Sequence, residues 1–256
     1  MLYIGTNLKM YKTGTQTVDF LTELHRLTAG IADELCLFVI PSYTALYQAR
    51  QAARDSHIRL GAQNMHWEDE GQFTGEISPV MLKELELQII EIGHSERRHV
   101  MGETDEEENK KVLAALKHGF TPLLCVGETA QQKDYGIADE IIAMQLKKGL
   151  YGVTRQDAGR LWIAYEPVWA IGVGGTPATE DYAQREHRLI KDVLTELFGE
   201  EAHRIPVLYG GSVNPGNASE MMAQEAVDGL FVGRSAWDAE AFDKLIRQVL
   251  PVCKNK

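Results

Sequence analysis

The sequence predicts an α/β protein with a single domain over residues 1–256, folded as a closed, parallel, eight-stranded (β/α)8 barrel. Apolar strand-like segments alternate with helix-like segments eight times along the chain. The strand-like segments are uninterrupted apolar runs, which indicates burial on both faces and a parallel sheet. About 250 residues is the usual length of such a barrel. An open doubly wound sheet would usually carry a Gly-rich dinucleotide turn after its first strand, and Asn7-Leu-Lys9 stands there instead.

The eight predicted strands are short apolar runs, most of which end in polar or glycine residues. Their polar ends matter below, because parallel strands of a barrel all end at the same face. The predicted strands cover residues 2–8, 35–40, 59–63, 88–93, 121–126, 161–165, 206–209 and 229–232.

The helices between the strands are predicted from apolar residues spaced three and four apart and from end signals. Thr104 with Glu107 matches a capping box. Asn217 with Glu220 indicates another N-cap, and Pro79 stands at a first helical position. The predicted helices cover about residues 18–27, 44–55, 79–86, 104–118, 137–151, 179–197 and 242–249, with a further one starting at 217.

The composition describes an ordinary globular protein that is strongly acidic. Its formal net charge of −11 argues against nucleic acid as a partner, because nucleic acid needs a basic face. We expect no membrane partner, since no 18-residue apolar run and no signal-peptide pattern occur. The three cysteines are widely spaced, which favours a reducing compartment and a cytoplasmic location. Cys36 and Cys125 lie inside apolar runs and are expected in the core.

The segment after the sixth predicted strand carries the strongest chemical signal. Glu166 stands at the carboxyl end of that strand, and Pro167 limits it to extended geometry. The connection formed by residues 167–179 is rich in glycine and begins with the apolar residues 168–171. Loops usually run over the surface, and an apolar loop needs something to cover. The segment therefore predicts a catalytic base with a lid over it.

Polar and glycine residues follow other predicted strands too, and these positions share one mouth in a barrel. Taken singly, each has an ordinary interpretation as a solvated lysine, a structural histidine or a plain turn. Their joint placement favours a site, because chance would scatter them over both ends of the barrel. The residues are Asn7, Lys9, His94, Ser95, Gly210, Gly211, Ser212, Gly233 and Arg234.

Together these groups suit proton abstraction from a carbon next to a carbonyl. Glu166 would take the proton, while Lys9 and a neutral His94 would stabilise the enediolate. His94 is expected to be neutral, because a helix N-terminus beside it disfavours the cationic form. The Gly-rich turns at residues 210–212 and 233–234 would hold a phosphate through backbone N–H groups. The reaction needs no metal and no organic cofactor, and the histidines lack the spacing of a metal-binding motif.

Five motifs, spread from the first predicted strand to the seventh, resemble those of the triosephosphate isomerase family. The resemblance implies a TIM barrel, an aldose–ketose isomerase activity and a homodimer. The motifs are Asn7-Leu-Lys-Met10, Ile92-Gly-His-Ser-Glu-Arg-Arg98, Leu124-Cys-Val-Gly-Glu128, Ala164-Tyr-Glu-Pro-Val-Trp-Ala-Ile-Gly172 and Tyr209-Gly-Gly-Ser-Val213.

The resemblance also implies a role for each site residue. Glu166 would be the base, His94 the electrophile and Lys9 the electrostatic partner. The loop of residues 63–78 would insert beside Lys9 and His94 of the partner subunit. The substrate-binding groups would be Asn7, Glu96, the turn at Gly210 and Gly211, and the backbone N–H groups of Gly172, Ser212, Gly233 and Arg234.

The chain departs from the family pattern at the rim of this site. Leu8 stands where the family usually has Trp, and Tyr11 stands where it usually has Asn. Val173 and Gly175 stand where the lid often has Thr and Lys, and Arg234 stands where a second Gly is usual. A changed substrate would produce such a pattern, and so would neutral drift or altered subunit packing.

The sequence favours the interconversion of glyceraldehyde 3-phosphate and dihydroxyacetone phosphate, as in glycolysis and gluconeogenesis. The alternative is isomerisation of a four-carbon sugar phosphate such as erythrulose phosphate, in polyol catabolism. A second alternative is a catalytically silent barrel used for binding, which the intact Lys9, His94 and Glu166 disfavour.

Overall fold

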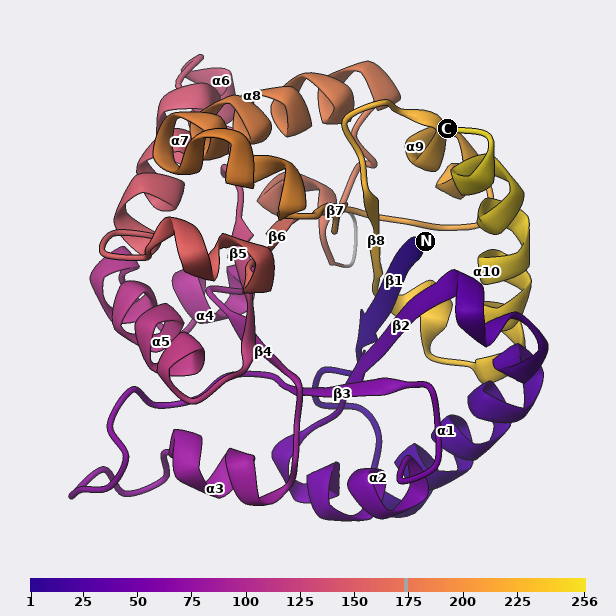
Figure 1. The fold of residues 1–256 in the computed structure, drawn as a ribbon. Helices are drawn as coiled ribbons and strands as arrows, with labels where there is room; N and C mark the ends of the chain where they lie inside the picture. The colour runs from indigo at the N-terminus through magenta and orange to yellow at the C-terminus, as the bar shows by residue number, and fades with distance from the viewer. Residues whose placement is uncertain (173–174) are drawn as a thin grey trace.

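The computed structural model describes residues 1–172 and 175–256, and its sheet is the predicted closed barrel (Figure 1). All neighbouring strands pair in parallel and follow one another around the ring in chain order. The predicted strands are confirmed to within a residue or two at each end. They are β1 (Leu2–Asn7), β2 (Leu35–Ile40), β3 (Arg59–Ala62), β4 (Ile89–Ile92), β5 (Thr121–Val126), β6 (Trp162–Tyr165), β7 (Val207–Tyr209) and β8 (Gly229–Val232).

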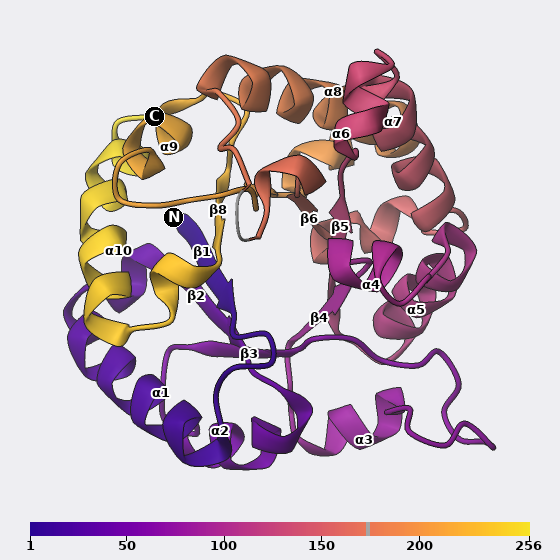
Figure 2. The ribbon, with the colours of Figure 1, turned by 180° about the vertical axis from the view of Figure 1, so that it is seen from behind.

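The helices form an outer ring around the strands, as the two opposite views show (Figures 1 and 2). The segment between β3 and the next helix has no helix or strand and projects from this ring. No helix in residues 1–172 or 175–256 has the length and apolarity needed to cross a lipid bilayer. The helices are α1 (Gly14–Thr28), α2 (Leu46–Ala52), α3 (Pro79–Glu84), α4 (Ser95–His99), α5 (Asp105–Lys117), α6 (Ala130–Asp134), α7 (Ala138–Gly149), α8 (Glu180–Phe198), α9 (Ala218–Ala223) and α10 (Ala239–Lys254).

Two of the predicted helix starts are confirmed in detail. The Thr104 side chain accepts a hydrogen bond from the Glu107 N–H, and the Glu107 carboxylate accepts one from the Thr104 N–H. Pro79 is the first residue of α3, as its missing N–H allows. The predicted N-cap at Asn217 is wrong in its chemistry, although α9 does begin at the next residue. The Asn217 side chain instead bonds the backbone of the preceding turn, at Ser212 and Asn214.

The inside of the barrel is filled by apolar side chains. Phe38 packs against Phe231 and Trp162, with ring centroids 5.5 and 5.4 Å apart. Gly5 makes room for this cluster, because a Cβ atom there would lie 2.4 Å from the Phe38 ring. Cys125 is buried on the same inner surface, as predicted for the core. The filled interior leaves the carboxyl ends of the strands as the place where polar groups converge.

Candidate active site

Glu166 lies at the carboxyl end of β6 and is only 3% exposed. Its backbone N–H donates to the Val126 carbonyl of β5 at 2.8 Å, which fixes the start of the connection. One carboxylate oxygen accepts a hydrogen bond from the Ser95 N–H at 3.4 Å, and the other lies 3.7 Å from His94 Nε2. Gly210 leaves space for this side chain, since a Cβ atom there would lie 2.9 Å from the Glu166 Cγ.

His94 faces Glu166 from the end of β4, where it caps the short helix α4. Its Nδ1 accepts a hydrogen bond from the Glu96 N–H at 3.1 Å. A nitrogen that accepts carries no proton, so this hydrogen bond favours the tautomer whose proton lies on Nε2. This tautomer would present an N–H group toward Glu166, and the role of His94 as a neutral donor stays a prediction. The N–H group that donates the hydrogen bond to Nδ1 belongs to Glu96, in the first turn of α4.

Lys9 enters the same mouth from the end of β1 in a left-handed conformation, with φ of 49°. This conformation is costly for a residue with a side chain. The Asn7 side chain holds it, because Asn7 Oδ1 accepts the Lys9 N–H at 2.6 Å. Gln63 donates to the same Asn7 oxygen and to the Lys9 carbonyl. Lys9 Nζ pairs with the half-exposed Glu96 at 2.8 Å, so Glu96 positions the lysine at the rim.

Asn7 therefore has a second function beside the predicted one. Its amide oxygen supports Lys9, and its amide nitrogen donates to Glu91 Oε2 at 2.7 Å. Contact of Asn7 with substrate stays a prediction.

Glu91 is the site residue that the sequence analysis missed. It lies in β4, is fully buried, and comes with Glu166 and His94 within 4.8 Å of one another. The available signal was a carboxylate inside the otherwise apolar run at 89–92. Burial and the nearby Glu166 raise the pKa of Glu91 well above its usual range, which favours the protonated form of this carboxyl group. A divalent cation would have to displace that proton, and we therefore do not assign these three residues as metal ligands.

The two predicted phosphate turns lie next to each other at the ends of β7 and β8. The Ser235 hydroxyl, beyond β8, donates to the Val213 carbonyl, beyond β7, at 3.0 Å, and this bond joins the turns. Gly210 and Gly211 are buried, and Ser212 and Gly233 are partly exposed. Arg234 is the first residue of a short 3-10 helix, and its side chain is exposed.

The segment predicted to form a lid begins with well-anchored residues. Glu128 is fully buried and accepts hydrogen bonds from the Trp169 indole at 2.7 Å and from the Tyr182 hydroxyl at 2.8 Å. Lys133 Nζ lies 3.4 Å from the centre of the Trp169 ring. These contacts show why the apolar start of this connection is packed rather than solvated. Glu128 was quoted in a motif but received no role from the sequence alone.

The far part of the lid is only partly described. Gly172 has a φ of 88° and is exposed, and Gly175 packs against the Ala170 backbone. Val173 and Gly174 lie outside the described residues.

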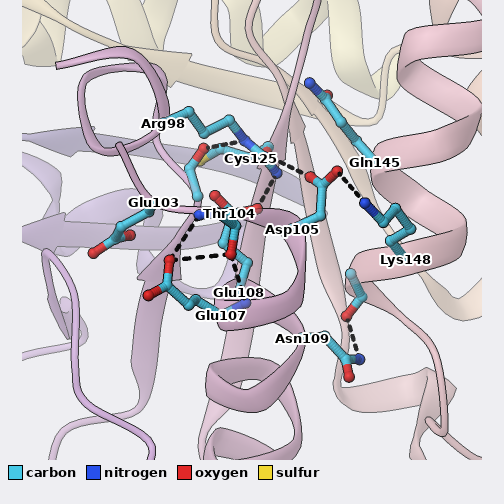
Figure 3. Close-up of polar contacts among 12 residues, drawn as sticks. Arg98, Glu103, Thr104, Asp105, Glu107, Glu108, Asn109, Cys125, Gln145 and Lys148 are labelled. Carbon is cyan, nitrogen blue, oxygen red and sulfur yellow. Dashed lines mark hydrogen bonds and ion pairs between the residues drawn. The ribbon is translucent and has the colours of Figure 1, made fainter. Parts of the chain in front are cut away.

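Arg98, on α4, contacts both neighbouring strand ends and α5 (Figure 3). Its guanidinium donates to the Gly93 carbonyl at 2.8 Å and to the Cys125 carbonyl at 2.9 Å. It also pairs with Asp105 at 2.6 Å and with Glu108 at 2.5 Å, both on α5. One buried cation thus ties β4, β5 and α5 together directly behind the site.

Comparison with known proteins agrees with this arrangement. The profile of the family described as triosephosphate isomerase matches residues 2–249. An L-erythrulose-1-phosphate isomerase from Rhizobium etli is 46% identical over 97% of this chain and 92% of its own length. One from Rhizobium meliloti is 45% identical over 97% of this chain and 96% of its own. A triosephosphate isomerase from Dictyoglomus turgidum is 42% identical over 95% of this chain and 98% of its own.

We predict that Arg98→Met destabilises the protein strongly, because it removes the buried partner of Asp105 and Glu108 and the donor to the Gly93 and Cys125 carbonyls. The free energy of unfolding should fall by about 3–5 kcal/mol, measured by urea denaturation. Arg188→Met is the matched control, because Arg188 forms an exposed pair with Glu225 and its loss should change little. An unfolding midpoint for Arg98→Met equal to that of the control would contradict the bracing role.

Proposed function

Because this chain belongs to the triosephosphate isomerase family and is an isomerase acting on a sugar phosphate, we propose that its substrate is a four-carbon ketose phosphate, erythrulose 1-phosphate. The observation that carries the choice is the similarity to L-erythrulose-1-phosphate isomerases at 45–46% identity over nearly the whole chain. The triose alternative has support from a relative at 42% identity. The preference among the two substrates is thus the reverse of the one that the sequence motifs favoured.

The site geometry supports enediolate chemistry for either substrate. Lys9 and the Nε2–H of His94 would donate to the carbonyl oxygen, and Glu166 would take a proton from the neighbouring carbon. The developing negative charge on oxygen would be stabilised by the same two donors. Glu166 would then return the proton to the former carbonyl carbon. Atoms balance without any external reactant, because one proton leaves one carbon and one proton reaches its neighbour while the hydroxyl proton transfers between the oxygens.

The four-carbon substrate changes the product but not the chemistry. Erythrulose 1-phosphate is dihydroxyacetone phosphate with a hydroxymethyl group added at the carbon farthest from the phosphate. Loss of the proton from C3 gives a 2,3-enediolate, and protonation at C2 leaves the carbonyl on C3. The product is therefore again a ketone, the 4-phosphate of a tetrulose, whereas the triose reaction yields an aldehyde.

Phosphate recognition is proposed for the joined turns of β7 and β8. Backbone N–H groups of Ser212, Gly233 and Arg234 would bind the dianion, with Gly172 of the lid closing over it. Such a site needs no cationic side chain, and this suits a protein with a net charge of −11. We also propose a cytoplasmic location, in line with the free thiols of Cys36, Cys125 and Cys253.

The substrate assignment predicts a clear ratio of specificities. On one enzyme preparation, kcat/KM for erythrulose 1-phosphate should exceed kcat/KM for glyceraldehyde 3-phosphate by at least about 10²-fold. A triose value near the diffusional ceiling of about 10⁸ M⁻¹s⁻¹, which triosephosphate isomerase itself exemplifies, would instead assign a glycolytic and gluconeogenic enzyme. Turnover of neither compound would favour the silent binding barrel.

The role of Glu166 predicts that Glu166→Asp keeps the fold but loses about 10²-fold in kcat. The shorter side chain moves the carboxylate by about 1 Å from the carbon that it deprotonates. Circular dichroism should report an unchanged thermal midpoint, so that the loss is chemical. Wild-type kcat in this variant would remove Glu166 from the mechanism.

A homodimer is proposed through the projecting loop of residues 63–78. The loop and the helix after it expose large apolar side chains, namely Phe73, Val80 and Met81. Light scattering at micromolar concentration should therefore give a mass near twice 28.6 kDa. Deleting residues 72–76 should give monomers with little activity, and an active dimer of the deletion variant would rule out this interface.

A further inference from the structure

We propose that Glu91 determines substrate specificity, by hydrogen-bonding the terminal hydroxyl group that a four-carbon substrate has and a triose phosphate lacks. This inference rests on the proposed function and assigns a residue to it. It follows from the position of Glu91 in the barrel, from its free oxygen atom and from the chemistry of a buried carboxylic acid.

Glu91 lies at the bottom of the candidate active site, on the inner face of β4. In β4 the buried Ile89 belongs to the cluster inside the barrel, and Ile90 and Ile92 belong to the cluster between barrel and helices. Side chains alternate along a strand, so Glu91 points inward with Ile89. It lies three residues before His94, on the same strand end. Glu91 is therefore placed just beneath the groups that would handle the carbonyl.

The orientation of a bound substrate brings its far end toward the bottom of the site. The proposed phosphate turns follow β7 and β8, and β4 lies four strands from β8 in the closed ring, on the opposite side. A substrate with its phosphate at β8 and its carbonyl between Glu166 and His94 extends toward β4. The carbon that a tetrulose adds is the one farthest from the phosphate. Its hydroxyl group would thus reach the side of the mouth where Glu91 lies.

Glu91 has an oxygen atom that the protein does not use. Asn7 donates to Oε2 at 2.7 Å, whereas Oε1 is buried and has no hydrogen-bond partner among the described residues. Leaving a buried polar atom unpaired costs free energy. The hydrogen bond from Asn7 needs only one acceptor atom. It therefore does not explain why Glu91 places a second buried oxygen, Oε1, near His94 and Glu166.

The protonation state gives this oxygen a defined chemistry. Because Oε2 accepts from Asn7, the proton of the neutral carboxyl group is free to lie on Oε1. A neutral acid both donates and accepts, which matches a hydroxyl group, and it places no second negative charge beside Glu166. A substrate without this hydroxyl leaves Oε1 unpaired, and a site built to bond a hydroxyl discriminates strongly against such an analogue.

The test compares Glu91→Leu with Glu91→Gln. In Glu91→Leu, kcat/KM for erythrulose 1-phosphate should fall by about 10- to 100-fold more than kcat/KM for glyceraldehyde 3-phosphate does, because any loss through Asn7 and Lys9 is shared by both substrates. Glu91→Gln retains a donor and an acceptor of the same size and should keep most of the preference. Cys125→Ala is the control, because Cys125 is buried on the inner surface of the next strand and has no proposed role.

A second measurement varies the substrate in place of the protein. The 4-deoxy analogue of erythrulose 1-phosphate, which ends in a methyl group, should be a 10- to 100-fold poorer substrate than erythrulose 1-phosphate for the wild-type enzyme. In Glu91→Leu this penalty should disappear. The wild-type comparison remains decisive even where Glu91→Leu fails to fold.

The outcomes separate the two proposals. If the wild-type enzyme turns over only the triose, the proposed function fails and this assignment falls with it. If the wild-type enzyme prefers the tetrulose but both substrates lose equally in Glu91→Leu, the proposed function stands and the inference is overturned. Glu91 would then be a positioning residue that acts through Asn7 and Lys9. Equal turnover of the 4-deoxy analogue by the wild-type enzyme would also overturn it.

Discussion

The arrangement depends on closure of the sheet between its first and last strands. Residues 3–6 of β1 pair with residues 229–232 of β8, and the approach is so close that a Cβ atom at Gly229 would lie 2.2 Å from the Tyr3 carbonyl oxygen. Closure turns eight separate strand ends into one rim. It brings Lys9 of the first strand end, His94 of the fourth and Glu166 of the sixth to a common centre, although they are far apart along the chain.

Three buried carboxyl groups at that rim have different chemical properties, because their hydrogen-bond partners and neighbours differ. Glu128 accepts hydrogen bonds from an indole and two phenols and anchors the start of the lid. Among the described residues, the Glu166 carboxylate accepts a hydrogen bond only from the Ser95 N–H, at 3.4 Å, so it is held more weakly than Glu128. Glu91 is fully buried and accepts a hydrogen bond from Asn7, and burial together with the nearby Glu166 raises its pKa, which favours the protonated form. The same residue type thus lies in three different environments: one anchors a loop, one suits the proposed base and one favours the protonated acid.

The sequence predicted the barrel, its strands and the convergence of Lys9, His94 and Glu166 at one mouth, because apolar periodicity and polar strand ends are local signals that the fold preserves. It could not reveal the partner of Asn7, since the contact joins residues 84 positions apart. Glu91 could not be assigned to the site for a related reason. The sequence shows a single carboxylate in an apolar run, but not which face of the strand points into the barrel. The side-chain cap expected at Asn217 failed because a nearby turn offered its side chain better partners.

Gly210 connects the proposed phosphate site with the proposed base, because it has no side chain to keep them apart. The turn that begins there is the proposed seat of the phosphate, and the same glycine lies against the Glu166 side chain. A displacement of this turn toward a bound anion would be transmitted to the base by direct contact. Binding energy from the unreactive end of the substrate is in this way available to set the position of the reactive group. A sugar without its phosphate would then lose turnover as well as affinity.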